Sequence, residues 1–233
     1  MRIEEFILEL KKINIEITKD QLSQLDRYYN LLVEWNQKLN LTSITKKEDV
    51  YLKHFYDSLT IVKAVDLNKV NNLCDVGTGA GFPGIVLKII FPNLNVILID
   101  SLNKRINFLN EIIKKLKLDN IKAVHTRMED YSKENIEKFD IITSRAVAKI
   151  QVLSEISFQS LKIGGQLILL KGQCEEEIVA SREILKKING KVKNIIKFKL
   201  PLENSNRTIV IIEKVAKTPN KYPRLMSKIK KSL

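Results

Sequence analysis

The sequence has few of the residues that build disulfides, metal sites or membrane spans. Of its 233 residues only two are cysteine, Cys74 and Cys174, and two are histidine. Because no Cys-x-x-Cys pair or Cys/His cluster with metal-ligand spacing occurs, we expect no metal site and a reducing compartment, the cytoplasm. No apolar run reaches the roughly 18 residues of a membrane helix. The start, Met1-Arg2-Ile3-Glu4-Glu5, lacks the order of a signal peptide. We expect a cytoplasmic monomer.

Acidic residues are also scarce relative to basic ones. The chain has 40 Lys and Arg residues against 27 Asp and Glu residues, which gives a net charge of +13. Such a surplus favours a polyanionic partner, nucleic acid before all others. Compositional bias is the alternative explanation. It accounts for lysine over arginine, but not by itself for basic over acidic residues.

Hydrophobic periodicity divides the chain into three parts. Residues 1–65 predict an N-terminal helical extension, in which Thr18 with Gln21 and Thr45 with Glu48 form capping-box patterns that open the second and third helices. Residues 66–217 alternate between strand and helix patterns and predict the main domain. Residues 218–233 form a basic tail, for which a short helix is one possibility.

The middle part predicts an α/β fold of the doubly wound, Rossmann-like kind. Strands are predicted over 72–76, 95–100, 121–125, 139–144, 165–171, 191–200 and 207–215. Helices are predicted over 83–91, 104–117, 151–161 and 175–189. The last two strands are joined by a short polar turn, so we expect a seven-stranded sheet that carries an antiparallel C-terminal hairpin at one side.

Glycine is the next scarce residue, and its distribution is informative. The chain has eight glycines, and four of them lie between Gly77 and Gly84, after a predicted strand and before a predicted helix. A glycine turn at a helix N-terminus exposes backbone N–H groups to a ligand. The second predicted strand ends about twenty residues later in Asp100, where an acid can accept the ribose hydroxyls of an adenosine cofactor. These features predict a nucleotide-like cofactor.

Two cofactors share this geometry, a dinucleotide and S-adenosylmethionine. The segment 79–84 is a literal G-x-G-x-x-G, which by itself is weakly specific. Asp75, two residues before the first glycine, favours S-adenosylmethionine, because a carboxylate there would repel a pyrophosphate but can reach an amino-acid end. The third and fourth strands are followed by Met128-Glu129 and by Arg145, which should face the same crevice. Glu129 is equally explained as an acid at a helix start.

Several segments together resemble one known family, in order and over nearly the whole chain. The sequence is similar to the bacterial small-subunit rRNA guanine-N7 methyltransferases, first described as glucose-inhibited division protein B. The resembling segments are Trp35-Asn36-Gln37-Lys38-Leu39-Asn40-Leu41-Thr42, His54-Phe55-Tyr56-Asp57-Ser58-Leu59, Asp75 to Ile85, Asp100-Ser101, Ser144-Arg145-Ala146, Leu170-Lys171-Gly172-Gln173, Arg207 before Ile209-Val210-Ile211-Ile212, and Thr218-Pro219-Asn220-Lys221-Tyr222-Pro223-Arg224.

The resemblance implies a class I S-adenosylmethionine-dependent methyltransferase that acts on N7 of a guanine in the decoding-region hairpin loop of 16S rRNA, in the small ribosomal subunit. For the methyl donor we expect Asp75, Gly77, Thr78, Gly79, Gly81, Phe82, Asp100, Ser101, Met128, Glu129 and Arg145. For the acceptor side we expect Asn40, His54, Arg145, Lys171 and Arg207. The family's usual Ala is Met128 here, and its Gly- and Pro-rich end is replaced by Leu225-Met226-Ser227-Lys228-Ile229-Lys230-Lys231.

Plainer explanations exist for some of these residues and for the function. His54 can be an ordinary buried histidine, Asn40 a helix C-cap and Lys171 a solvated strand end. Guanine N7 carries a lone pair and no proton, so a general base is not required and positioning carries the catalysis. The alternative functions are a non-catalytic RNA-binding or ribosome-assembly protein and a nucleotide-dependent oxidoreductase.

Overall fold

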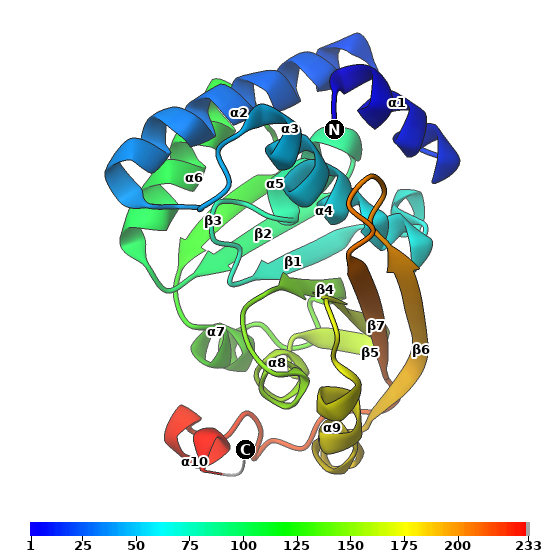
Figure 1. Ribbon diagram of the computed structural model, residues 1–233. Coiled ribbons are helices and arrows are strands. Elements are labelled where there is room, and N and C mark those ends of the chain that lie inside the picture. Colours follow the sequence, from blue (N-terminus) through cyan, green and yellow to red (C-terminus); the bar gives the residue numbers. More distant parts are fainter. Residues whose placement is uncertain (232–233) are drawn as a thin grey trace.

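The computed structural model describes residues 1–231, and the chain begins with a helical layer (Figure 1). α1 (Ile3–Lys12) and α2 (Lys19–Leu39) are followed by one continuous helical stretch. That stretch consists of α3 (Lys47–Val50), the π-helical η1 (Tyr51–Tyr56), α4 (Asp57–Leu59) and the 3₁₀ turn η2 (Thr60–Lys63). A second 3₁₀ turn, η3 (Leu67–Lys69), leads into the sheet.

The sheet has seven strands in the order β3-β2-β1-β4-β5-β7-β6. Its strands are β1 (Asn72–Val76), β2 (Asn95–Asp100), β3 (Ile121–His125), β4 (Phe139–Arg145), β5 (Leu161–Lys171), β6 (Gly190–Lys199) and β7 (Asn206–Lys214). The first five pair in parallel, and β7 lies antiparallel between β5 and β6. The predicted fold class, strand number and C-terminal hairpin are confirmed. β5 begins four residues earlier than predicted.

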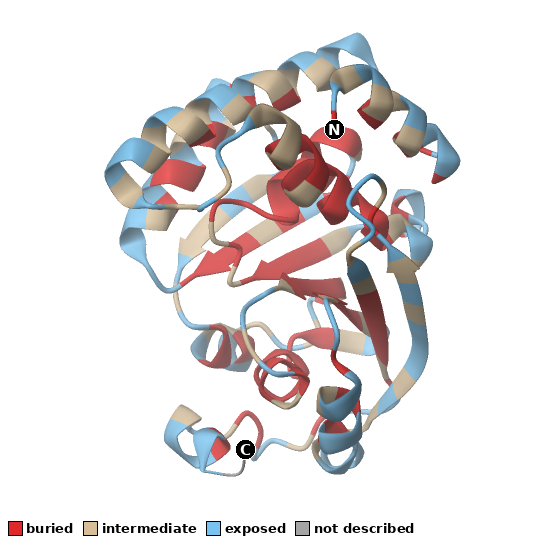
Figure 2. Cartoon of the chain, in the orientation of Figure 1, coloured by how far each residue is buried: buried red, intermediate tan, exposed pale blue. Residues whose placement is uncertain are grey.

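Helices cover both faces of the sheet, as apolar parallel strands require (Figure 1). α5 (Gly84–Ile90) and α6 (Asn103–Lys115) lie on one face, and α2 packs across both of them. α7 (Met128–Glu134), α8 (Ile150–Ser157) and α9 (Glu175–Lys187) cover the other face, with the short α10 (Met226–Lys230) beside them. Figure 2 shows buried central strands between these layers and an exposed outer side of α2.

Two features of the helical layer test the capping patterns. Thr18 caps α2 through a complete capping box with Gln21, as predicted. The box predicted at Thr45 is wrong, because Lys46 is the N-cap of α3 and makes no side-chain cap bond. The Thr45 carbonyl instead accepts a hydrogen bond from the Tyr29 hydroxyl. Thr45 thus lies outside the helix, with its carbonyl bonded to a side chain of α2.

The helical layer and the sheet share one apolar core. Phe6, Leu25, Leu32 and Phe55 from the N-terminal helices belong to the same buried cluster as residues of α5, α6 and the sheet. The division into parts 1–65, 66–217 and 218–233 stays a prediction, and residues 232 and 233 of its last part lie outside the described residues.

Candidate active site

The turn after β1 has a backbone that glycine makes possible. Gly77 and Gly79 have φ of 65° and 61°, in the left-handed region that side chains rarely adopt. A Cβ on Gly77 would lie 2.6 Å from the Val147 side chain, whereas one on Gly79 would meet nothing closer than the Gly77 carbonyl at 4.0 Å. The turn is thus packed on one side and leaves open space in front of Gly79.

Asp75 supports this turn from behind. Its carboxylate is fully buried, and Oδ2 accepts hydrogen bonds from the Thr78 hydroxyl (2.6 Å) and the Gly84 amide (2.8 Å). Oδ1 is buried and has no hydrogen-bond partner among the described residues. Burial raises the pKa of Asp75 to about 6, against the opposing effect of these two hydrogen bonds. The structure therefore places Asp75 beneath the loop, outside the linings of both cavities described below.

Asp100 connects the ends of the first two strands. Its Oδ2 accepts hydrogen bonds from the Gly79 amide (3.0 Å) and from Arg105 Nη1 (3.1 Å), and Oδ1 accepts one from the Leu102 amide (3.0 Å). Only 2 % of Asp100 is exposed. A carboxylate has about four lone-pair positions, so Asp100 keeps acceptor capacity on the side that lines the cavities.

A cavity of about 360 Å³, here called the smaller cavity, opens between the carboxyl ends of β1 and β2, α7 and α8. Its lining includes the predicted residues Gly77, Asp100, Ser101, Met128 and Glu129. This size is within the usual range for a small-molecule site. Apolar walls around two buried acids suit an adenosine, whose base is apolar on its faces and whose ribose donates hydrogen bonds. The smaller cavity therefore fits S-adenosylmethionine.

A second cavity of about 660 Å³, the larger cavity, lies between the sheet and the helical layer. The two cavities have four lining residues in common: Gly77, Asp100, Ser101 and Val147. The larger cavity is also lined by residues predicted for the methyl donor and by residues predicted for the acceptor side. They are Thr78, Gly79, Phe82, His54, Arg145, Lys171 and Arg207. Val147, whose side chain packs close to Gly77, lines both cavities.

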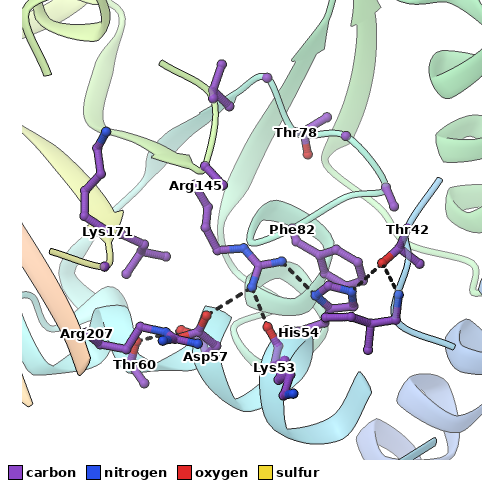
Figure 3. A pocket seen from close by; sticks show the side chains of 18 of the residues that line it. Thr42, Lys53, His54, Asp57, Thr60, Thr78, Phe82, Arg145, Lys171 and Arg207 are labelled. Carbon is purple, nitrogen blue, oxygen red and sulfur yellow. Dashed lines mark hydrogen bonds and ion pairs between the residues drawn. The ribbon is translucent and has the colours of Figure 1, made fainter. Parts of the chain in front are cut away.

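Arg145 is the centre of the larger cavity (Figure 3). Its Nη1 donates to the Lys53 carbonyl (2.7 Å) and to Asp57 Oδ2 (3.2 Å), and its Nη2 contacts His54 Nδ1 (3.0 Å). Asp57 Oδ1 accepts a further hydrogen bond from Arg207 Nε (2.9 Å). Asp57 thus holds two arginines side by side, one from β4 and one from β7.

The contacts of His54 define its protonation. Arginine has donors and no acceptor, so His54 Nδ1 must be the acceptor and Nε2 must carry the proton. Nε2 then donates to Thr42 Oγ1 at 2.9 Å. Burial, followed by the charge of Arg145, lowers the pKa of His54 to about 3. His54 is a neutral histidine whose ring stacks on Phe82, with centroids 4.4 Å apart.

Lys171 holds the loop that follows β4. Its ammonium donates to the Ala148 carbonyl (2.7 Å) and to Glu177 Oε2 (2.8 Å), and its side chain is 12 % exposed. Figure 3 shows Lys171 at the edge of the cavity, directed away from Arg145. Lys171 is therefore not a solvated strand end but a tie between β5, the Ala148 loop and α9.

Two further predicted residues lie outside both linings. Asn40 is exposed and ends α2 with φ of 48°, the C-cap arrangement that the sequence left open. Gly81 is buried, and a Cβ there would lie 2.6 Å from the Tyr28 hydroxyl. Gly81 therefore permits close packing of α2 on the turn.

Sequence reasoning gave no role to Thr42, Lys53 or Asp57. Thr42 and Asp57 lie within segments that carry the family resemblance, and this resemblance is the signal by which the sequence could have identified them. Within residues 1–231, no helix combines the length and apolar character needed to cross a membrane, and no group of His, Cys, Asp and Glu side chains could hold a metal ion.

Solved structures with this fold include methyltransferases. A SAM dependent methyltransferase from Aquifex aeolicus is 22% identical with a TM-score of 0.51, covering 71% of this chain and 93% of that one. P. horikoshii TYW2, in complex with MeSAdo, is 16% identical with a TM-score of 0.52, covering 64% of this chain and 61% of that one. At these identities the likeness shows the fold: the chain has the Rossmann-like fold of these proteins, with two adjoining cavities at the carboxyl ends of its strands.

The family follows from closer relatives. The family model described as GidB, rRNA small subunit methyltransferase G, matches residues 21–210. Proteins named ribosomal RNA small subunit methyltransferase G from Bacillus subtilis and Bacillus licheniformis are each 48% identical over 227 residues, covering 96% of this chain and 95% of each relative. The chain belongs to this family, which decides for methyl transfer over the oxidoreductase alternative.

Proposed function

We propose that this protein transfers a methyl group from S-adenosylmethionine to N7 of a guanine in the decoding-region hairpin loop of 16S rRNA, as a cytoplasmic monomer. The observation that carries the proposal is the shared wall of the two cavities at Gly77, Asp100, Ser101 and Val147. A donor in one cavity and an acceptor base in the other would meet there. The names of the relatives support rRNA of the small subunit as the acceptor.

In the smaller cavity the donor would be held at both ends of its nucleoside. Asp100 would accept the ribose hydroxyls, and Met128 and Glu129 would lie against the adenine. The amino-acid end would extend past the shared Gly77 into the larger cavity, where the open face of Gly79 would admit it. Bound S-adenosylmethionine supplies a methyl group on a positively charged sulfur. The loop glycines bring backbone N–H groups close to the ligand without a side chain in between.

In the larger cavity the acceptor guanine would be positioned, not deprotonated. N7 already carries a lone pair. His54 is unsuited to act as a base, since both ring nitrogens are engaged and the pKa of His54 is lowered to about 3. Thr42 Oγ1 accepts from His54 Nε2 and from the Ile44 amide, so its own proton is left to donate to a ligand. The guanine O6 beside N7 is an acceptor of the right kind.

The cations around the larger cavity suit an RNA backbone. Lys53, Arg145, Lys171 and Arg207 all line it. Each phosphate contact releases bound counterions, so RNA affinity should fall as the salt concentration rises. The ring gains positive charge on methylation, so these cations are expected to hold phosphates or O6 and not to face N7.

The test is methyl transfer to small ribosomal subunits from cells that lack the enzyme, with labelled S-adenosylmethionine and mass spectrometry of the digested rRNA. We expect 7-methylguanosine at a single position in the 16S rRNA. Naked rRNA, assembly intermediates and mature subunits are compared in parallel. Arg207→Ala should lose transfer, whereas Arg182→Ala, on the exposed side of α9 outside both cavities, should keep it. Tight RNA binding without transfer would favour a non-catalytic assembly protein.

A further inference from the structure

The smaller cavity has a wall that comes from the end of the chain. Met226 and Lys230 of α10 line it together with Asp100, Met128 and Glu129. These two residues belong to the segment in which the sequence departs from the Gly- and Pro-rich end of its family. This wall is thus built by a segment that departs from the family's usual end.

The segment before α10 is firmly docked. Thr218 is fully buried, and its hydroxyl contacts the Phe158 and Ile188 carbonyls, both at 3.3 Å. The Gln159 side-chain amide donates to the Pro219 carbonyl (3.2 Å) and to the Tyr222 carbonyl (2.9 Å). The path of the chain toward α10 is therefore fixed by buried polar contacts.

The last anchor lies directly before α10. Arg224 binds the Glu155 carboxylate through two side-chain hydrogen bonds, Nε to Oε1 at 2.8 Å and Nη2 to Oε2 at 2.7 Å. Its backbone amide donates a third hydrogen bond, to Oε1, at 3.0 Å. The Glu155 side chain is only 1 % exposed. Two-pronged arginine–carboxylate pairs fix direction as well as distance, so this pair fixes the position of the chain just before α10 relative to α8.

The faces of α10 have different surroundings. Ile229 is 2 % exposed and belongs to the apolar cluster that contains residues of α8 and α9. Met226 and Lys230 are four residues apart and so share a face, which is the face that lines the smaller cavity. Lys228 is exposed and absent from that lining.

We propose that α10 is a donor-binding element of this enzyme, in which Met226 packs against the adenosine of S-adenosylmethionine in the smaller cavity. A methionine thioether is polarizable and makes favourable contacts with aromatic rings. Because α10 forms part of the cavity wall, bound donor and docked α10 stabilise each other. The proposal rests on the proposed function for the identity of the ligand and adds a binding surface to it.

The test is titration calorimetry with S-adenosylhomocysteine, the methyl-free product. We expect Met226→Ala to bind it about fivefold more weakly, because the variant loses apolar contact area with the ligand. Met226→Leu should restore most of the affinity. The matched control is Leu225→Ala, since Leu225 is 62% exposed and does not line the cavity. Met226→Ala with the affinity of Leu225→Ala would overturn the proposal. Failure of the unmodified protein to bind would instead overturn the proposed function.

A second measurement reports on α10 directly. Trypsin can cut after Lys228, Lys230 and Lys231 once α10 opens. We expect saturating S-adenosylhomocysteine to slow these cuts at least about fivefold in the unmodified protein and much less in Met226→Ala, since a ligand that binds the closed form lowers the open population. Equal cutting rates with and without the ligand would refute the coupling.

Discussion

The carboxylate of Asp57 offers the sharpest test of how the larger cavity is held together. It accepts from Arg145 Nη1 and from Arg207 Nε, two residues that lie far along the chain. Asp57→Asn keeps the size of the side chain but removes its charge and one acceptor oxygen. One arginine then faces an amide NH₂ group, which is a donor. We expect both guanidiniums to move.

The size of the effect follows from the contacts that remain. A hydrogen bond to a charged group contributes about 1.5–3 kcal/mol, so two such bonds set an upper bound of about 6 kcal/mol. Both arginines keep other partners, since Arg145 still reaches the Lys53 carbonyl and Arg207 the Ser205 hydroxyl. Their side chains are 15% and 23% exposed, so water replaces part of the loss. We therefore expect the free energy of unfolding to fall by about 2–3 kcal/mol.

The assay combines urea unfolding with two functional measurements. Methyl transfer to the small subunit should fall at least about tenfold, because the positions of two cations change. Binding of S-adenosylhomocysteine should stay within about twofold, because Asp57 does not line the smaller cavity. The matched control is Asp49→Asn in α3, whose pair with Lys53 is long (3.9 Å) and exposed and should contribute under about 0.5 kcal/mol. If Asp57→Asn behaves like this control, the two hydrogen bonds to Asp57 are not what holds Arg145 and Arg207 in place.

Three further predictions concern other parts of the site. The pKa of His54 is lowered to about 3, so its contribution to stability is lost as pH falls below about 6.5. The pKa of Asp75 is raised to about 6, so its contribution has the opposite sign and is lost as pH rises from about 4 to 6. His54→Gln removes the His54 contribution, which grows as pH rises across that window, and leaves the Asp75 contribution, which is lost. The free energy of unfolding should therefore fall with rising pH by up to about 1.4 kcal/mol per pH unit more than in the unmodified protein. A pH profile of stability equal to that of the unmodified protein would contradict a neutral, buried His54. Gly81→Ala should lower the thermal midpoint through a loss of about 2–4 kcal/mol, since its φ is 99° and its Cβ would meet the Tyr28 hydroxyl; a stable variant would show that α2 can shift. Lys171→Met should keep the fold, measured by circular dichroism, and lose methyl transfer about tenfold because the loop after β4 loses its tie; full activity would remove Lys171 from the site.

Local patterns predicted the sheet well. The predicted strands 72–76, 95–100 and 121–125 coincide with β1, β2 and β3. Each of these is a short segment rich in apolar residues and bounded by turn residues, a signal contained within a few neighbouring positions. The helical layer was predicted less well, because the π-helical turn at Tyr51–Tyr56 and the uncapped start of α3 depend on packing against distant residues.

The sequence by itself determined the class of this protein. Its glycine turn, the acid that ends the second strand and the family-like segments are all readable along the chain, because a backbone cradle needs particular residues at short fixed spacings. Tertiary structure alone decided how the site is assembled. Asp57 and Arg207 are 150 positions apart, and α10 reaches the smaller cavity through contacts between distant parts of the chain such as the pair of Arg224 and Glu155. Such pairings depend on where the folded chain brings charges together out of water, and no local spacing records that.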